Sequence, residues 1–534
     1  MMNFNHRYDD GKHVPVYGKR GMVATSQPLG AQAGLEILKK GGNAIDAAIA
    51  TAACMTVLEP TSNGIGSDAF AIIWTKGKLH GLNASGNAPE LMSVEALHKR
   101  GRSKVPKYGL EPVMVPGAPA AWAECIRRFG KLSLKEVMQP AIDYAQSGYP
   151  VSEVVAKNWK TAFEMYTALK GPEFENWFKT FAPEGRTPRA GELWKSEEMA
   201  DSLRKIADSN AEAFYRGELA EKIDRFSRKF DGFIRKEDLQ KYRAEWVEPI
   251  SVNYRGYDVW ELPPNGQGLV TLIALKILNQ LELPYKELPD TYHKLIESLK
   301  LAFTDGKKYI TDPSYMHDEV TQLLSEAHSL ERAQLIGEKA IQPKAGSLPK
   351  GGTVYLATAD EEGNMVSYIQ SNFKGFGSGI VIPGTGISLQ NRGFDFSLNK
   401  EDTNCLYPGK KSYHTIIPGF VTKNGQPVGP FGVMGEYMQP QGQLQVITNS
   451  IDFHMNPQAA LDAPRWQWIS DKKVMVEPDF PIDIAHELAG RGHEITIALD
   501  MNSFGRGQII WRDQETGVLV GGTESRADGI IAAW

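Results

Sequence analysis

The tripeptide Gly351-Gly352-Thr353 stands at the head of a run with the two-residue periodicity of a β-strand. In residues 354–359 the side chains alternate between two faces, which predicts a strand half-buried in a sheet. Residues 360–364 (DEEGN) predict a turn, and residues 365–371 predict the returning strand of a hairpin. A threonine at the start of such a strand becomes an N-terminal residue if the peptide bond before it breaks.

An N-terminal Thr353 would carry both a nucleophile and a base. Its α-amine, with a reference pKa of roughly 7.7–8.0, would accept the proton of its own hydroxyl. Gly352 suits the cleavage step, because glycine tolerates the strained backbone that an N-to-O acyl shift requires. Taken alone, the triplet is weak evidence, because most Gly-Gly-Thr triplets are ordinary junctions between a loop and a strand.

Bulk properties exclude several classes of protein. A length of 534 residues is compatible with three domains, yet no linker, repeat or charge block divides the chain. A formal net charge of −5 argues against nucleic-acid and anionic-membrane partners. No apolar run approaches the ~20 residues of a membrane span. The N-terminus, MMNFNHRYDDGKH, lacks the apolar core of a secretory signal, which predicts a cytoplasmic protein.

Metal and cofactor motifs are weak. Cys54, Cys125 and Cys405 are too scattered for a disulfide framework or a zinc cluster, and no two of the 11 histidines are three or four residues apart. Residues 64–69 (GIGSDA) fit a dinucleotide-binding pattern but follow a helix and Pro60 rather than a strand. There is no G-x-S-x-G motif. We therefore expect no metal and no cofactor.

The two parts of the chain differ in texture. Before about residue 350 the pattern predicts mainly helices, at 29–40, 44–57, 118–129, 134–147 and 291–304, with a strand at 69–74. From Thr353 onward it predicts strands at 353–359, 365–371, 415–422, 428–433, 509–512 and 518–521, with helices at 441–450 and 482–491. Hairpin sheets flanked by helices indicate an α+β fold with two packed sheets, each covered by helices.

Three segments resemble the γ-glutamyltransferase (γ-glutamyl transpeptidase) family: residues 22–70, the glycine-rich turn 375–381, and residues 449–466. The resemblance extends from about Gly21 to Gly529. It implies the four-layer αββα sandwich of N-terminal-nucleophile hydrolases. It also implies a proenzyme that cuts itself between Gly352 and Thr353. The large subunit, 1–352, and the small catalytic subunit, 353–534, would share one core and remain associated, and a homodimer is possible.

The resemblance further implies a reaction. Thr353 would attack γ-glutamyl amides such as glutathione, and water or an amine would take the acyl group from the acyl-enzyme. Ser371 would orient the new α-amine. The backbone N–H groups of Gly435 and Glu436 would stabilise the oxyanion. Because Glu436 replaces a family glycine, its N–H can serve only if its φ is allowed for a residue with a Cβ.

The predicted donor site departs from the family, whose binding residues are replaced at most positions. The corresponding residues here are Ser85 (an arginine in the family), Phe373, Arg392, Asp395 and the pair His414-Thr415. Asp395 alone is retained. Arg392 would either bind a substrate carboxylate in a bidentate fashion or neutralise Asp395, and His414 would be a donor on the pocket wall. The short interval between Asp395 and His414 implies an open pocket.

These departures keep other functions open. Cephalosporin or glutaryl acylases and oxamate amidohydrolases belong to the same superfamily and remain alternatives to a γ-glutamyl enzyme. A hypothesis from a different class is a catalytically silent scaffold that keeps the fold. The altered donor site favours the scaffold, whereas the Gly352-Thr353 junction and Ser371 favour an enzyme that binds a small amide or peptide.

Overall fold

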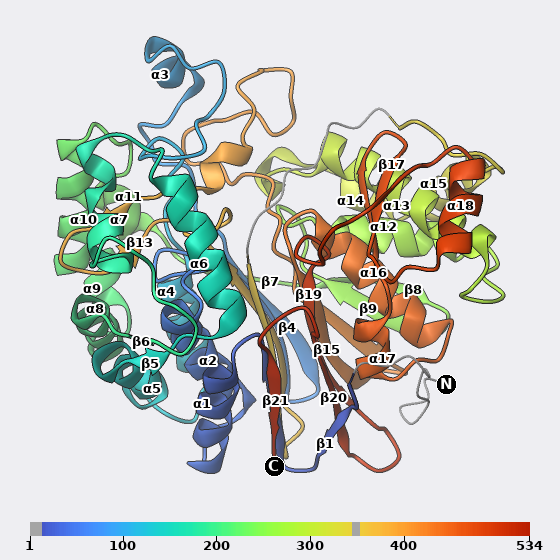
Figure 1. Cartoon of the computed structure of the whole chain (residues 1–534), viewed down its shortest axis with the longest axis horizontal. Coiled ribbons are helices and arrows are strands. Elements are labelled where there is room, and N and C mark those ends of the chain that lie inside the picture. The colour runs from blue at the N-terminus through green and yellow to red at the C-terminus, as the bar shows by residue number, and fades with distance from the viewer. Residues whose placement is uncertain (1–12, 344–352) are drawn as a thin grey trace.

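Two seven-stranded sheets lie face to face and form the centre of the molecule (Figure 1). The computed structural model describes residues 13–343 and 353–534. Helices cover the outer face of each sheet, so that the order of layers is helix, sheet, sheet, helix. The predicted four-layer αββα sandwich is therefore confirmed.

The strand that begins directly after Thr353 lies in the interior of the first sheet. Every neighbouring pair of its strands is antiparallel. Its order is β21 (Ile530–Ala533), β2 (Gly21–Thr25), β10 (Val354–Asp360), β11 (Met365–Ser371), β3 (Asp68–Thr75), β4 (Lys78–Ala84) and β7 (Glu245–Val247). Strands from before and after residue 353 are thus hydrogen-bonded to one another within one sheet.

The second sheet is also antiparallel throughout. Its order is β1 (Val16–Gly18), β20 (Leu519–Thr523), β19 (Arg506–Arg512), β15 (Gln426–Met434), β14 (Gly419–Lys423), β9 (Tyr257–Glu261) and β8 (Ile250–Tyr254). An apolar cluster that includes Phe70, Tyr355, Ile369, Phe420 and Ile510 fills the space between the two sheets.

Helices of small or apolar residues cover the two outer faces. On the first sheet lie α1 (Pro28–Lys39), α2 (Ala44–Leu58) and α4 (Ala118–Phe129), with α5 (Leu134–Ser147) packed on α2; on the second lie α12 (Gly268–Leu278), α16 (Met438–Ile451) and α17 (Pro457–Asp462), with α13 (Pro289–Tyr309) packed on α12. Every residue of α2 is buried. A reciprocal capping box between Asn43 and Asp46 fixes where this helix begins.

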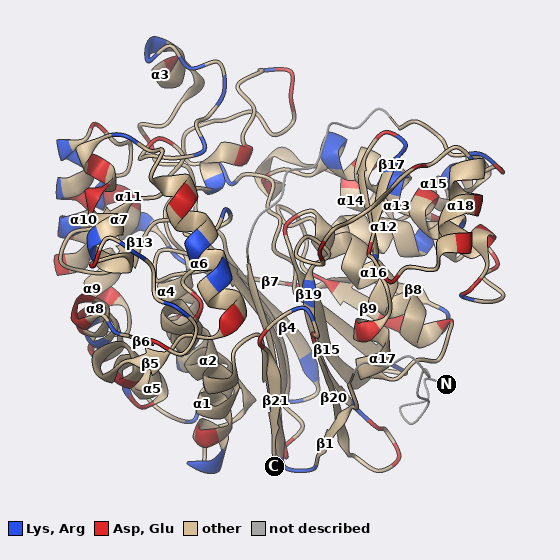
Figure 2. Ribbon diagram, in the orientation of Figure 1, with Lys and Arg blue, Asp and Glu red and all other residues tan. Residues whose placement is uncertain are grey.

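The remaining elements lie at the periphery. They are α3 (Val94–Lys99), α6 (Glu153–Tyr166), α7 (Glu175–Phe181), α8 (Glu197–Asp208), α9 (Glu212–Tyr215), α10 (Glu218–Lys229), α11 (Lys236–Lys241), α14 (Glu319–Leu323), α15 (Glu326–Gln334), α18 (Ile482–Gly490), β16 (Trp466–Ser470), β17 (Lys473–Val476), β18 (Glu494–Ile497) and four two-residue strands. Charged residues of both signs are spread over the outer helices (Figure 2). Among the described residues, no helix combines the length and apolarity needed to cross a bilayer.

The sequence predictions of secondary structure were accurate for helices and less so for strands. Helices 118–129 and 134–147 have the predicted bounds. The strand expected at 415–422 is β14 and begins only at Gly419, because Gln267, Gln439 and Gln443 side chains take the backbone groups of residues 415–417. The strand after Thr353 was expected to be half-buried, but β10 is buried on both faces because helices and the second sheet sandwich it.

Candidate active site

Thr353 lies directly before β10, opposite the last residue of β11. The β10–β11 register pairs Val354 with Gln370, which places Thr353 beside Ser371. The Oγ1 of Thr353 donates a hydrogen bond to the Oγ of Ser371 at 3.2 Å, and both side chains are buried. The N–H of Phe373 donates to the same Ser371 oxygen at 2.8 Å. The two hydroxyls are thus adjacent, as the sequence predicted, while Gly352 lies outside the described residues.

Gly435 and Glu436 form the turn that leads from β15 into α16. Gly435 has φ +140° and Glu436 has φ +53°. The value at Glu436 is in the left-handed region, which is allowed for residues with a Cβ but is occupied rarely, at a cost of roughly 1–2 kcal/mol. The turn therefore meets the condition that the sequence analysis set for a backbone donor at Glu436. The N-terminus of α16 lies directly behind it and adds a favourable field for an anion.

The side chain of Glu436 forms a buried ion pair with Lys374. Burial raises the pKa of Glu436 to about 7 and lowers the pKa of Lys374, although each partner's charge opposes the shift of the other. Both shifts favour the neutral forms. The pair therefore adds little net charge beside the oxyanion turn near neutral pH.

Arg392 does not neutralise Asp395. Its Nη1 donates to Thr415 Oγ1 at 2.8 Å, and its Nε lies 3.9 Å from a carboxylate oxygen of Asp68. Only 1% of Arg392 is exposed, yet its Nε and Nη2 have no hydrogen-bond partner among the described residues. Asp395 instead accepts a hydrogen bond from the hydroxyl of Tyr437 at 2.8 Å. The guanidinium therefore keeps donor capacity for an anionic ligand.

Asp68, which the sequence analysis did not single out, joins several of the predicted residues. Its carboxylate lies 3.0 Å from His414 Nε2 and accepts from the Gly86 N–H at 3.1 Å. Burial raises the pKa of Asp68 to about 7. The sequence signal that could have identified Asp68 is a carboxylate at the start of the continuous apolar strand β3.

His414 is turned toward Asp68. Its Nδ1 accepts from the Ile416 N–H at 3.4 Å, so the ring proton is on Nε2 and is donated to Asp68. Burial lowers the pKa of His414 well below its usual value, so the ring is neutral. The predicted donor on the pocket wall thus already has an acceptor, and His414 positions Asp68.

Ser85 also lies in an internal network. Its Oγ donates to Asn83 Oδ1 at 2.7 Å, and its carbonyl oxygen accepts from the Tyr242 hydroxyl at 3.2 Å. Asn265 is a further partner. The serine that replaces the family's arginine therefore holds neighbouring loops together and offers no cation to a substrate.

Gln439, in the first turn of α16, is a second residue that the sequence analysis missed. Its Nε2 lies 3.5 Å from Thr353 Oγ1, the long limit of a hydrogen bond. Its Oε1 accepts from the Ile417 N–H at 3.0 Å, which fixes the orientation of the amide. The sequence signal that could have identified Gln439 is a polar side chain at the start of a buried helix.

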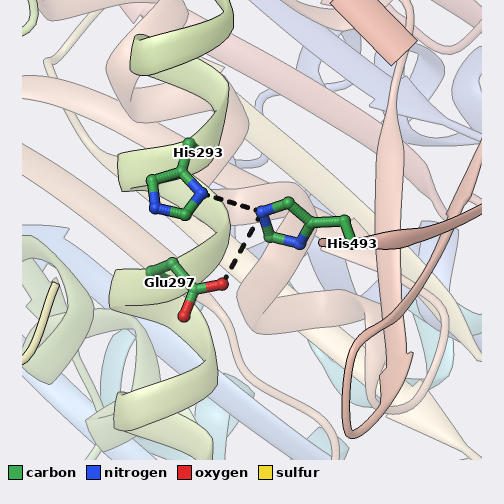
Figure 3. A group of neighbouring side chains, drawn as sticks. All are labelled: His293, Glu297 and His493. Atoms are coloured by element: carbon green, nitrogen blue, oxygen red, sulfur yellow. Dashed lines mark hydrogen bonds and ion pairs between the residues drawn. The ribbon is translucent and has the colours of Figure 1, made fainter. Parts of the chain in front are cut away.

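A separate cluster has the residue types of a metal site. His293 and Glu297 lie one turn apart on α13, and His493 Nε2 lies 2.8 Å from His293 Nδ1 and 3.7 Å from a Glu297 oxygen (Figure 3). His293 Nε2 faces the Gly337 carbonyl oxygen at 2.9 Å, so His293 Nδ1 accepts from His493. The ammonium of Lys300 holds Glu297 at 2.7 Å. A metal would have to displace both contacts, and the cluster is explained as a hydrogen-bonded brace.

The four-layer fold places the chain in the class of N-terminal-nucleophile hydrolases. The family model for gamma-glutamyltranspeptidase matches residues 30–534, and the chain belongs to that family.

Its relatives carry different names. The chain is 36% identical to the glutathione hydrolase-like YwrD proenzyme of Bacillus subtilis, over 96% of this chain and 98% of that protein. It is 32% identical to the oxamate amidohydrolase proenzyme of Klebsiella pneumoniae, over 98% and 100%. A solved cephalosporin acylase from Bacillus halodurans has 60% identity and a TM-score of 0.96, over 100% of this chain and 99% of that one.

Proposed function

We propose that the protein is a self-cleaving amidohydrolase whose nucleophile is Thr353 and whose substrates are amides of carboxylate-bearing acyl groups. The contact between the hydroxyls of Thr353 and Ser371 at the head of β10 carries the first part of this proposal. The buried guanidinium of Arg392, with two nitrogens that lack hydrogen-bond partners in the described chain, carries the second.

Maturation would begin with attack of Thr353 Oγ1 on the carbonyl carbon of Gly352. The peptide C–N bond breaks as the ester forms, and the nitrogen becomes the α-amine of Thr353. Water then hydrolyses the ester. The products are the fragments 1–352 and 353–534.

Turnover would use the same hydroxyl. Thr353 Oγ1 attacks the substrate carbonyl and its proton passes to the α-amine, while the carbonyl oxygen takes negative charge facing the N–H groups of Gly435 and Glu436. The C–N bond breaks and the α-ammonium returns its proton to the leaving amine. Water, deprotonated by the α-amine, releases the acid from the ester. An amine in place of water gives acyl transfer.

The acyl half would be recognised through its carboxylate. Arg392 offers Nε and Nη2 on one edge of its guanidinium, the edge that binds carboxylates in a bidentate fashion. Asp395 keeps one oxygen, Oδ2, without a hydrogen-bond partner in the described part of the chain. That oxygen suits the ammonium group of a γ-glutamyl donor, which makes γ-glutamyl amides our first candidate.

Glutaryl and oxamate amides are the second candidate. They carry the carboxylate but no ammonium, and the names of the oxamate amidohydrolase relative and of the cephalosporin acylase neighbour are compatible with such acyl groups. A catalytically silent scaffold is the remaining alternative, and it predicts neither self-cleavage nor turnover.

A panel of anilides with one common leaving group tests the proposal. We expect kcat/KM for γ-glutamyl and glutaryl anilides to exceed that for the acetyl anilide at least tenfold, and ammonia release tests oxamate. Equal rates on all three anilides would remove the carboxylate from the proposal. An uncut chain on a denaturing gel, together with no turnover, would favour the scaffold.

A further inference from the structure

A cavity of about 400 Å³ lies beside the oxyanion turn. Met434 and Gly435 form one side of it, α6 forms another, and the loop before β19 closes a third. Its lining residues include Tyr108, Ala162, Met165, Lys374, Asp500 and Arg506. The volume suits an organic group of the size of a small drug or dipeptide.

The cavity is separate from the proposed carboxylate site of the acyl group. Arg392 and Thr415 are not among its lining residues, whereas Gly435 is. The acyl and amine halves of an amide lie on opposite sides of its carbonyl carbon. An amide whose carbonyl oxygen faces the Gly435 N–H, with its acyl half toward Arg392, would therefore direct its amine half into this cavity.

Arg506 gives the cavity a specific chemical character. It is the first residue of β19 and lies opposite Met434 in the β15–β19 register. Only 8% of it is exposed. Its guanidinium makes no hydrogen bond to any other described residue, and its nearest carboxylate is Glu59, with Nη1 3.9 Å from Oε1. None of its three nitrogens is a fully buried atom that lacks a partner, so they keep access to open space and can donate hydrogen bonds to a ligand in the cavity.

We propose that this cavity is the subsite for the amine half of the substrate and that Arg506 binds a carboxylate carried by that amine. The inference rests on the proposed function and adds the class of leaving group. The carbon body of the amine would pack on Ala162, Met165 and Tyr108. One guanidinium matches one carboxylate in a bidentate pair, and the Asp500 carboxylate in the lining disfavours a dianion such as phosphate.

Two chromogenic amides that differ by one carboxylate test the inference: γ-glutamyl-4-nitroanilide and γ-glutamyl-3-carboxy-4-nitroanilide. We expect the wild type to prefer the carboxylated amide. Arg506→Gln should lower the ratio of kcat/KM values, carboxylated over neutral, by about 10- to 100-fold, the range for loss of a charged hydrogen bond. Arg506→Lys should give an intermediate ratio. Arg127→Gln, which removes an exposed guanidinium on α4, is the matched control and should leave the ratio unchanged.

A binding measurement separates this inference from the proposed function. The amine products, 5-amino-2-nitrobenzoate and 4-nitroaniline, bind without any chemistry, and calorimetry with the mature wild type and with Arg506→Gln measures their affinities. We expect the carboxylated amine to bind more tightly to the wild type and to lose that advantage in Arg506→Gln. Equal affinities in both proteins would overturn the inference. Arg506-dependent binding without turnover of either amide would instead contradict the proposed acyl specificity.

Discussion

The guanidinium of Arg392 lies over the ring of Phe373, with 4.0 Å between Cζ and the ring centroid. The ammonium of Lys374 lies 4.2 Å from the centroid of the same ring. One aromatic side chain thus contacts two buried basic groups, and cation–π attraction lowers the cost of burying either group in its charged form. Because Phe373 is itself buried, the space near Arg392 is defined by an apolar surface as well as by charge.

Replacement of Thr353 by alanine should abolish both maturation and activity. Alanine has no hydroxyl to attack the preceding carbonyl, so the protein should remain one chain on a denaturing gel. In the wild type, mass spectrometry should find a new N-terminus at Thr353. An N-terminus at any other position would contradict the assignment of the nucleophile.

Removal of the Ser371 hydroxyl should slow turnover while the fold persists. Its Oγ is the hydrogen-bond acceptor for Thr353 Oγ1 and for the Phe373 N–H, so Ser371→Ala would release both groups. Contributions of acid–base groups, about 10²–10⁴-fold, set the upper limit of the loss in kcat. Ser371→Thr should restore part of the rate. Wild-type kcat in Ser371→Ala would show that the hydroxyl is merely structural.

Gln439 should act as a positioning residue. In Gln439→Leu the amide donor near Thr353 Oγ1 is lost, and we expect kcat to fall about 2- to 10-fold, the range for one neutral hydrogen bond. KM should change less than kcat, because the contact is made to the nucleophile. Gln443→Leu, in the next turn of α16, is the matched control for the loss of a buried amide. A rise in KM with an unchanged kcat would contradict this role.

Arg392→Ala should abolish the preference for carboxylate-bearing acyl groups without preventing self-cleavage. Loss of one partner from a desolvated charge pair costs about 2–5 kcal/mol, which corresponds to roughly 30- to several-thousand-fold in kcat/KM. The acetyl anilide should be affected less. If the γ-glutamyl and acetyl anilides lose activity equally, Arg392 supports the fold of the site and does not bind the carboxylate.

Asp68 should give the protein a pH-dependent stability. Its pKa is about 7 in the folded state and roughly 4 in an unfolded chain. Between these values the folded protein retains a proton that the unfolded chain has lost, so stability falls as pH rises from about 4 to 7 and levels off above. Asp68→Asn cannot ionise, and its melting temperature should decline less over this interval. The exposed control Asp483→Asn should follow the wild type.

The fold was predictable because its evidence is local. Small-residue helices such as α2, with a capping asparagine, and alternating strands such as β10 and β11 carry their own signals. The start of β14 was not predictable, because distant glutamine side chains take the backbone groups that would have extended it. Competition between ladder and side-chain hydrogen bonds is a tertiary effect.

Within the candidate site, only contacts between residues close to each other in the sequence could be predicted. The hairpin register places Thr353 beside Ser371, and the sequence predicted that contact. Asp68, Gln439 and Arg506 come from three separate elements and meet the site through packing, so no spacing in the sequence links them. His414 shows the same limit, since its residue type suggested a donor to the substrate but the structure turns its donor to Asp68.

The position of β10 between β2 and β11 has a consequence for assembly. Within the first sheet, β2 of the amino-terminal part is hydrogen-bonded on both sides by strands from beyond residue 353, namely β10 and β21. A single chain can form this interleaved strand pairing in a reaction that does not depend on protein concentration. Two polypeptides made from separate genes would have to form the same strand pairing in a bimolecular reaction, in competition with their own aggregation. This interleaved strand pairing therefore favours folding as one chain, followed by cleavage.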